Sequence, residues 1–206
     1  MLTLPPRNTG RAARSRGVTM IEVLVALLIL TVGLLGVAGL QARMQTAEIE
    51  AFQRAQAIVL VQDMVDRINA NRVNAASYAT GSVTLGTGTT LDCTSLTSVM
   101  LKDKCEWSSA MLGDAETRVI SGTTTKIGAM NEARGCITVP VATMPREVVI
   151  AVVWQGIAST VVPTATNCGQ GEAAYGSDGK LRRALIARVK IACLQNDPTT
   201  GVCVTP

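Results

Sequence analysis

A run of apolar residues near the start of the chain restricts its fold more than any other feature. The 18 residues from Val23 to Leu40 carry no charge, and as an α-helix they would rise about 27 Å, close to the roughly 30 Å hydrocarbon thickness of a bilayer. Four arginines and no acidic residue precede this run within the first 17 residues. The positive-inside rule therefore predicts that the leader stays in the cytoplasm and that the rest of the chain crosses the membrane.

A pattern that is typical of a helix continues beyond the apolar run. No proline or glycine interrupts residues 41–76, and small or apolar residues recur there at steps of three or four: Met44, Ala47, Ala51, Ala55, Ile58, Val61, Val65 and Ile68. The pattern predicts one helix from Val18 to about Ala76, on the order of 88 Å long. Its first half needs support from lipid or from copies of similar helices.

An ordinary secretory signal peptide is the alternative interpretation of this segment. The small residues Gly36 to Ala38 could form a cleavage site before Gly39. However, Glu22 at the start of the apolar core is unusual for a signal peptide, and the helical pattern continues past Gly39. A membrane-spanning helix is therefore preferred, and a signal-cleaved soluble periplasmic binding protein remains an alternative.

The composition excludes several classes of function. The chain has no histidine, which excludes Ser-His-Asp triads and zinc sites that need imidazole. Apart from the four leader arginines, basic and acidic residues are equal in number, 15 each, so no nucleic-acid-binding surface is expected. Asp178-Gly179 is a lone turn signal without the oxygen ligands that calcium needs. We predict no enzyme activity, metal or cofactor.

Six cysteines follow the apolar run: Cys93, Cys105, Cys136, Cys168, Cys193 and Cys203. In an oxidising compartment an even number with long spacings predicts three disulfides, for which 15 connectivities exist. We favour sequential pairing, because each bridge then closes a short or medium loop and contributes roughly 3 kcal/mol. The spacing alone leaves the other pairings open.

The remaining sequence predicts an α+β domain. Gly, Thr and Ser dominate residues 77–98, which indicates a loop. A short helix is expected to end at Gly113. Its buried face should consist of Leu101, Cys105, Ser108 and Leu112. Strands are expected at 137–141, 148–154, 158–162 and 185–191, in a small antiparallel sheet that leans on the long helix. We expect Trp154 in the core, and Arg182 and Arg183 in solvent at the start of the last strand.

The residues from Arg16 to Leu27, Arg-Gly-Val-Thr-Met-Ile-Glu-Val-Leu-Val-Ala-Leu, closely resemble the type III signal of type IV prepilins and type II secretion pseudopilins. The resemblance implies cleavage after Gly17 by a membrane prepilin peptidase and N-methylation of the new terminus at Val18, where phenylalanine is usual. It also implies a type IV pilin-like fold and burial of the apolar helix in the central bundle of a filament.

Further stretches resemble minor pilins of the PilV kind: residues 63–72, Gly135-Cys136-Ile137, Val153 to Gly156, Cys168 to Gly171, and Arg182-Arg183. This resemblance implies a minor pilin of a Gram-negative bacterium, anchored in the inner membrane with a periplasmic domain. It would prime pilus assembly with other minor pilins and the major pilin, and would lie at the filament tip, where a large tip adhesin is a candidate partner. A minor pseudopilin of a type II secretion system is the alternative.

Glu22 has two interpretations that are compatible. Thr19 and Glu22 have the spacing of a capping box, and a carboxylate suits the positive end of a helix. The resemblance implies that Glu22 also meets the terminal amine of a neighbouring subunit, a pair worth about 4 kcal/mol before desolvation at 4 Å and an effective dielectric near 20. The expected organisation is a leader (1–17), a transmembrane helix (18–41), its amphipathic continuation (42–76) and a periplasmic domain (77–206).

Overall fold

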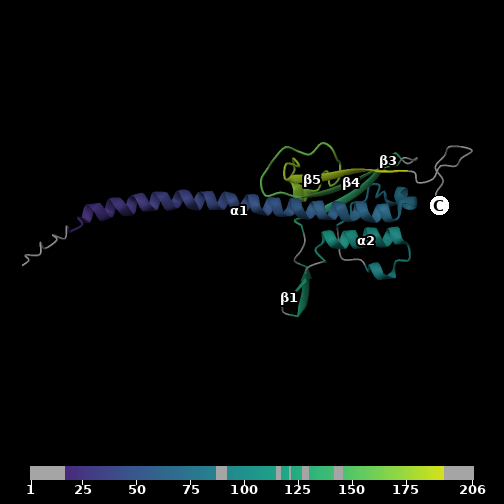
Figure 1. Cartoon of the computed structure of the whole chain (residues 1–206), viewed down its shortest axis with the longest axis horizontal. Helices are drawn as coiled ribbons and strands as arrows, with labels where there is room; N and C mark the ends of the chain where they lie inside the picture. Colours follow the sequence, from purple (N-terminus) through teal and green to yellow (C-terminus); the bar gives the residue numbers. More distant parts are fainter. Residues whose placement is uncertain are drawn as a thin grey trace, which may run out of the picture. The chain divides into compact units, whose positions relative to one another are not determined.

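The computed structural model describes residues 17–86, 92–114, 117–120, 122–126, 130–141 and 146–192. Its longest element is helix α1, Met20–Ala70, with 51 residues (Figure 1). The helix begins after Thr19, whose carbonyl oxygen accepts hydrogen bonds from the N–H groups of Glu22 at 3.0 Å and Val23 at 3.3 Å. The predicted long N-terminal helix is therefore confirmed.

The predicted end of this helix near Ala76 is wrong. The α-helix stops at Ala70, and a 3₁₀ helix, η1, runs over Arg72–Tyr78. The tighter winding begins where the N–H of Asn74 donates to the carbonyl oxygen of Asn71. The change of path places the Tyr78 ring in the core, with 0% of its surface exposed. Burial of one aromatic ring thus ends the α-helix before its periodic pattern does.

The chain divides into two compact units, residues 1–45 and 46–206, and α1 contributes to both. In the first unit every described residue is exposed. This part of α1 is strongly apolar, and the helix is long and apolar enough to cross a membrane. Apolar side chains thus surround the helix there on all sides.

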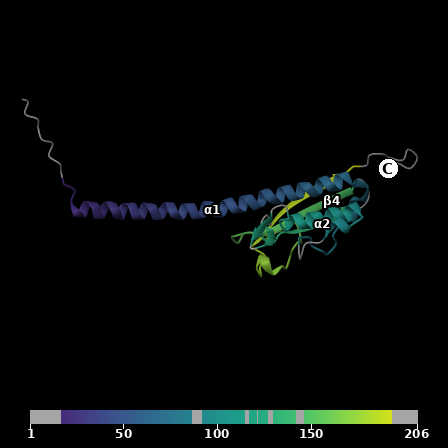
Figure 2. The same ribbon diagram turned by 90° about the horizontal axis from the view of Figure 1, so that it is seen from below.

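The second unit is built around a three-stranded antiparallel sheet in the order β3-β4-β5. Its strands are β3 (Arg134–Val141), β4 (Arg146–Gln155) and β5 (Arg182–Ile191), and the central strand lies beside the second half of α1 (Figure 2). The register between β4 and β5 runs without a shift through ten pairs, from Arg146↔Ile191 to Gln155↔Arg182. The predicted α+β fold with a small antiparallel sheet is confirmed.

One face of the sheet packs against α1 and helix α2, Val99–Met111. The α1 helix buries Gln53 and four apolar side chains, Ala57, Val61, Met64 and Ile68. The four apolar side chains form one cluster with Trp107 and alternate residues of β4. Trp107 is fully buried and its indole N–H donates to the carbonyl oxygen of Leu60 at 2.8 Å. The α2 helix is thereby fixed along α1.

The opposite face of the sheet carries a smaller apolar cluster of Ala151, Val153, Cys168 and Tyr175. The connection between β4 and β5 covers this face and contains one short 3₁₀ helix, η3, at Ala173–Tyr175. Because β4 is covered on both faces, its side chains are apolar in both directions, as its sequence predicted. Trp154 lies in the core as expected, with 4% of its surface exposed.

Two other expectations for this unit need correction, and one element was not predicted. Residues 158–162 form no strand, because the Ala158 carbonyl oxygen accepts from the Arg183 side chain and not from a neighbouring strand. The α2 helix does exist, Gly113 follows it with φ +84°, and Cys105 and Ser108 are buried as expected. However, Leu101 is exposed, and Trp107 and Met111 are buried as well. A two-stranded hairpin, β1 (Thr117–Ile120) with β2 (Thr123–Lys126), was not predicted.

Candidate functional site

The residues that the sequence singles out for processing lie just before the first turn of α1. Gly17, Val18 and Thr19 are non-helical and exposed, and Val18 has 68% of its surface exposed. The space around Gly17 is open, since no atom comes within 4 Å of the position of a β-carbon. The peptide bond between Gly17 and Val18 is therefore accessible and outside regular structure.

Glu22 lies in the first turn of α1 and is exposed. Its backbone N–H donates to Thr19, so the helix start at Thr19 fits the N-cap position that a capping box requires. The carboxylate stands on a part of the helix whose neighbours are almost all apolar, from Met20 to Leu40. It is thus a charged group at the edge of a surface that favours lipid or other apolar helices.

A second site lies where Glu50 of α1 contacts the start of β5. The Glu50 carboxylate accepts from the Arg183 guanidinium at 3.0 Å and from the backbone N–H of Ile157 at 3.2 Å. Arg183 also donates to the carbonyl oxygen of Ala158 at 2.6 Å and to Thr160 Oγ1 at 2.7 Å. We call these residues (Glu50, Gly156, Ile157, Ala158 and Arg183) the helix latch.

Gly156 leaves space for Arg183 in the helix latch. A β-carbon at this position would lie 2.5 Å from Arg183 Cζ, so another residue there would require the guanidinium to shift. The β4 strand therefore ends at Gln155, and Gly156 directly after it leaves room for the Arg183 guanidinium. The expectation that Arg183 is solvated is wrong, because only 15% of its side chain is exposed and its guanidinium donates to four acceptors within the chain.

Arg182 is also not solvated, and only 3% of its surface is exposed. Its guanidinium donates to the carbonyl oxygens of Pro163 at 2.8 Å, Thr166 at 3.2 Å and Cys168 at 2.7 Å. A buried cation needs such acceptors to replace its lost hydration. Arg182 consequently fixes the connection between β4 and β5, which the Cys136–Cys168 disulfide ties to β3.

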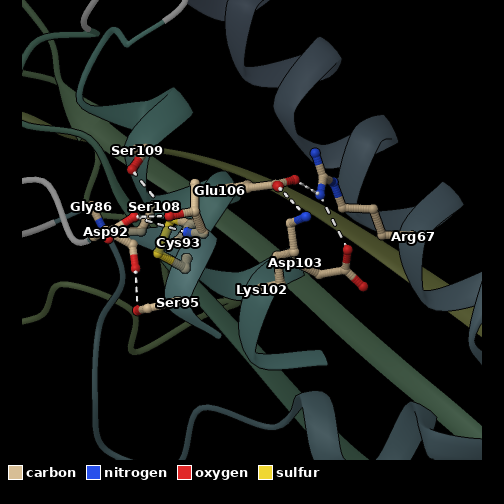
Figure 3. The surroundings of a disulfide bond; sticks show 12 residues. Arg67, Gly86, Asp92, Cys93, Ser95, Lys102, Asp103, Glu106, Ser108 and Ser109 are labelled. Carbon is tan, nitrogen blue, oxygen red and sulfur yellow. Dashed lines mark hydrogen bonds and ion pairs between the residues drawn. A yellow bond between two sulfur atoms is a disulfide. The ribbon is translucent and has the colours of Figure 1, made fainter. Parts of the chain in front are cut away.

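Near the C-terminal end of α1, Arg67 connects α1 to α2 (Figure 3). Its guanidinium pairs with Asp63 at 3.0 Å, with Asp103 at 3.1 Å and with Glu106 at 2.7 Å. Burial lowers the pKa of Arg67, but hydrogen bonds to Glu106, Asp63 and Asp103 outweigh this effect and raise the pKa above its usual value. Arg67 therefore stays charged at any physiological pH and crosslinks α1 to α2.

Tyr78 closes the same network from η1. Its hydroxyl donates to Asp103 and accepts from the Asn71 side chain. Burial, followed by the hydrogen bond to Asp103, raises the pKa of Tyr78 to about 12. The neutral phenol is therefore the form that the folded chain stabilises.

Two disulfides are present in the described residues. Cys93–Cys105 joins η2 (Cys93–Ser95) to α2, and Cys136–Cys168 joins β3 to the β4–β5 connection. Both pairs belong to the sequential scheme that the spacing favoured. Cys193 and Cys203 lie outside the described residues.

Beside the first disulfide, the Gly86 N–H donates to Ser108 Oγ at 2.9 Å (Figure 3). Together these two bonds hold Gly86 and Cys93 against α2. Among the residues that the structure describes, no group of three or more Cys, Asp or Glu side chains could hold a metal ion.

The three stretches Val153 to Gly156, Cys168 to Gly171 and Arg182-Arg183 meet at one end of the sheet, within the helix latch and the Arg182 contacts. Sequence reasoning selected them by resemblance but missed Glu50, their partner on α1. Glu50 lies among other charged and polar residues, such as Glu48 and Arg54, so the sequence held no signal that set it apart. The structure does not bring Glu22 into this group.

Two family models match adjoining parts of the chain. Residues 12–38 match the prokaryotic N-terminal methylation motif, and residues 39–110 match the family described as type IV pilin Tt1218. A search of curated proteins and a search of solved structures found no significant match. Over residues 39–110 the chain is thus similar to a type IV pilin, and this similarity begins where the match to the methylation motif ends.

Proposed function

We propose that this chain is a minor pilin of a type IV pilus that is anchored in the inner membrane through α1 and then assembled with other pilins. The observation that carries the proposal is the change in exposure along α1. Every residue from Met20 to Gln45 is exposed, although this part is strongly apolar. Apolar surface of this size is stable only in lipid or against other apolar helices.

Processing is the first step of the proposed function. A prepilin peptidase cleaves between Gly17 and Val18, and the new terminus at Val18 is methylated. The match to the N-terminal methylation motif at residues 12–38 supports this step, and so does the exposed, non-helical backbone at the proposed cleavage point. The residues before Val18 would form the cytoplasmic leader, and the unit from Thr46 onward would lie in the periplasm.

Intact mass of the protein purified from its own membranes tests this step. We expect a chain that begins at a methylated Val18. A bulky residue at Gly17 should leave the full-length precursor in the membrane. A chain that begins at Gly39 would instead establish an ordinary signal peptide. If the wild-type chain and the Gly17 variant were both unprocessed, the proposal would be rejected.

Glu22 is the proposed assembly residue. Its charge contributes nothing to anchoring, since a charge within a membrane costs on the order of 3 kcal/mol, but it can pair with the terminal amine of a neighbouring subunit. A Glu22→Val chain should insert in the membrane normally and co-purify poorly with other pilins. Normal co-purification and normal numbers of surface pili would show that Glu22 only caps its helix.

The place of the subunit in the machine is the finest part of the proposal. We infer that it joins a complex of minor pilins that primes assembly and lies at the filament tip. Deletion of the gene should reduce the number of surface pili while leaving type II secretion intact. Loss of secreted proteins with normal pili would identify a type II secretion pseudopilin instead.

A further inference from the structure

The strand β5 forms an edge of the three-stranded sheet, because the strand order is β3-β4-β5. Its pairing with β4 is regular over ten residues, without a bulge. Proteins usually shorten, bend or cover such an edge, since its free backbone groups can pair with another strand. A long, regular edge therefore indicates a place where another strand can add.

The hydrogen bonds of β3 show which backbone groups of β5 are free. Gly135 and Ile137 of β3 exchange hydrogen bonds with Leu85 and Thr80, away from β4. The backbone N–H and C=O groups of Cys136, which lies between them, therefore point toward β4 and bond to its partner Ala151. The backbone groups of Ile150 and Val152, on either side of Ala151 in β4, then point toward β5.

The same alternation continues into β5. Ile150 and Val152 pair with Ala187 and Leu185 through their backbone groups, so the alternate residues Ala184, Ile186, Arg188 and Lys190 point their N–H and C=O groups away from the sheet. In the described part of the chain, no residue bonds to these backbone groups. At the start of the strand the loop residues Ala158 and Thr160 contact Arg183, so the free edge begins at Ala184.

The side chains along this free edge are apolar at one end and cationic at the other. Ala184 and Ile186 pack on the outer cluster of the sheet, and Leu185, Ala187 and Val189 pack on the α1 side, each only partly buried. Arg188 and Lys190 follow on the outer face. Arg188 pairs with Glu147 at 2.9 Å, but 63% of its side chain is exposed, and β5 contains no acidic residue.

We propose that the free edge of β5, from Ala184 to Lys190, binds an extended acidic segment of another protein as a fourth strand. Apolar residues of that segment would complete the partly covered core beside Leu185 and Val189. Acidic residues on its outer face would lie opposite Arg188 and Lys190, where opposite charges on neighbouring strands stabilise the pair.

A second copy of this chain fits the edge less well. Two β5 strands that paired antiparallel about Val189 would place Arg188 of each copy opposite Lys190 of the other, with no acid on either strand. Like charges across neighbouring strands destabilise the pair. The cations thus disfavour self-association and leave the edge open to an acidic partner.

Residue-resolved hydrogen exchange on the full-length chain in detergent micelles tests this proposal. The probes are two ten-residue peptides of alternating valine and threonine, in which two threonines near one end are replaced by glutamates or, in the matched control, by lysines. The glutamate peptide should slow exchange at the N–H groups of Ala184, Ile186 and Arg188 roughly tenfold or more. The N–H groups of Leu185, Ala187 and Val189 should already exchange slowly without peptide.

The double variant Arg188→Glu/Lys190→Glu provides the reciprocal arm. It should lose the response to the glutamate peptide and respond to the lysine peptide. Continued slow exchange at Leu185 and Ala187 would show that the sheet is intact in the variant.

Three results would overturn the proposal. These are no slowing by the glutamate peptide at millimolar concentration, equal slowing by both peptides, and slowing that rises with the concentration of the chain itself, which would assign the edge to a second copy. The edge contains none of the N-terminal residues. Failure of this test therefore leaves the proposed pilin function standing, and failure of the processing test leaves this edge standing.

Discussion

From Met20 to Gln45 every residue of α1 is exposed, whereas from Thr46 to Ala70 the same helix buries five side chains against its own domain. The first stretch is apolar on all sides, and the second has one apolar stripe with polar residues beside it. Burial of a large apolar side chain contributes about 1.5–3 kcal/mol. In the second stretch this contribution comes from within the chain, and in the first it must come from lipid or from other subunits.

The strongest test of this contrast is a matched pair of alanine substitutions on α1, one in each half of the helix. Met64 is fully buried, whereas Leu34 has 67% of its surface exposed. We expect Met64→Ala to lower the free energy of unfolding of the domain by about 2–5 kcal/mol, because it leaves a cavity. Leu34→Ala should change it by less than about 0.5 kcal/mol. Denaturant unfolding in micelles, followed by tryptophan fluorescence, measures both.

Equal losses in the two variants would break the contrast, because they would mean that the first half of α1 also packs on the domain. A loss in neither variant would place Met64 outside the cooperative core.

Alkaline titration tests the end of the buried half, at Tyr78. Since the folded chain raises the pKa of Tyr78 to about 12, the stabilising contribution of the neutral phenol is present below pH 10. It is lost as the pH rises from about 10 to 12, because the unfolded chain ionises its tyrosines near pH 10. Burial also raises the pKa of Tyr175, the only other tyrosine.

Ultraviolet absorption of phenolate should therefore show no tyrosine ionising near pH 10 in the folded chain. In Tyr78→Phe the remaining signal, from Tyr175, should begin only well above pH 10. A full tyrosine titration at pH 10 in the folded wild-type chain would contradict the buried network around Asp103.

The smallest effect is expected at the border between the two halves, in the helix latch. Glu50→Gln keeps the shape of the side chain but removes the charge that binds Arg183, and should cost about 1 kcal/mol. Glu48→Gln, two residues earlier on an exposed position, should cost nothing measurable. Amide exchange of residues 46–53 should become faster only in the first variant.

A double-mutant cycle with Arg183→Met separates the ion pair from the packing of Arg183. A coupling near zero between Glu50 and Arg183 would show that the latch acts through the backbone of Ile157 and Ala158 alone.

Helix α1 and strand β4 could be predicted because their signals are local. A long uncharged run, a spacing of three and four, and a strand that is apolar in both directions each reflect burial along one element. The end of α1 could not be predicted, since it depends on Tyr78 entering a core formed by α2 and the sheet. Likewise the buried face of α2 depends on the bond from Trp107 to Leu60, across 47 positions of sequence.

The helix latch and the Arg182 contacts could not be predicted from the sequence, for a different reason. An arginine in sequence carries no mark of its acceptors, and here most of them are backbone oxygens or lie far away on α1. The two valines at 161 and 162 suggested a strand, but the chain there follows the side chains of Arg182 and Arg183 instead of a neighbouring strand. The hairpin β1–β2 is short and rich in threonine, and gave no apolar alternation to detect.

The contacts of Arg182 have a consequence for how this chain can change over time. The guanidinium binds the main-chain oxygens of Pro163, Thr166 and Cys168, and every residue type offers the same oxygen. Exposed side chains of this loop, such as Thr164 and Ala165, can therefore be replaced without altering its path. The outer surface of the loop can thus change in sequence while one arginine and one disulfide preserve its shape.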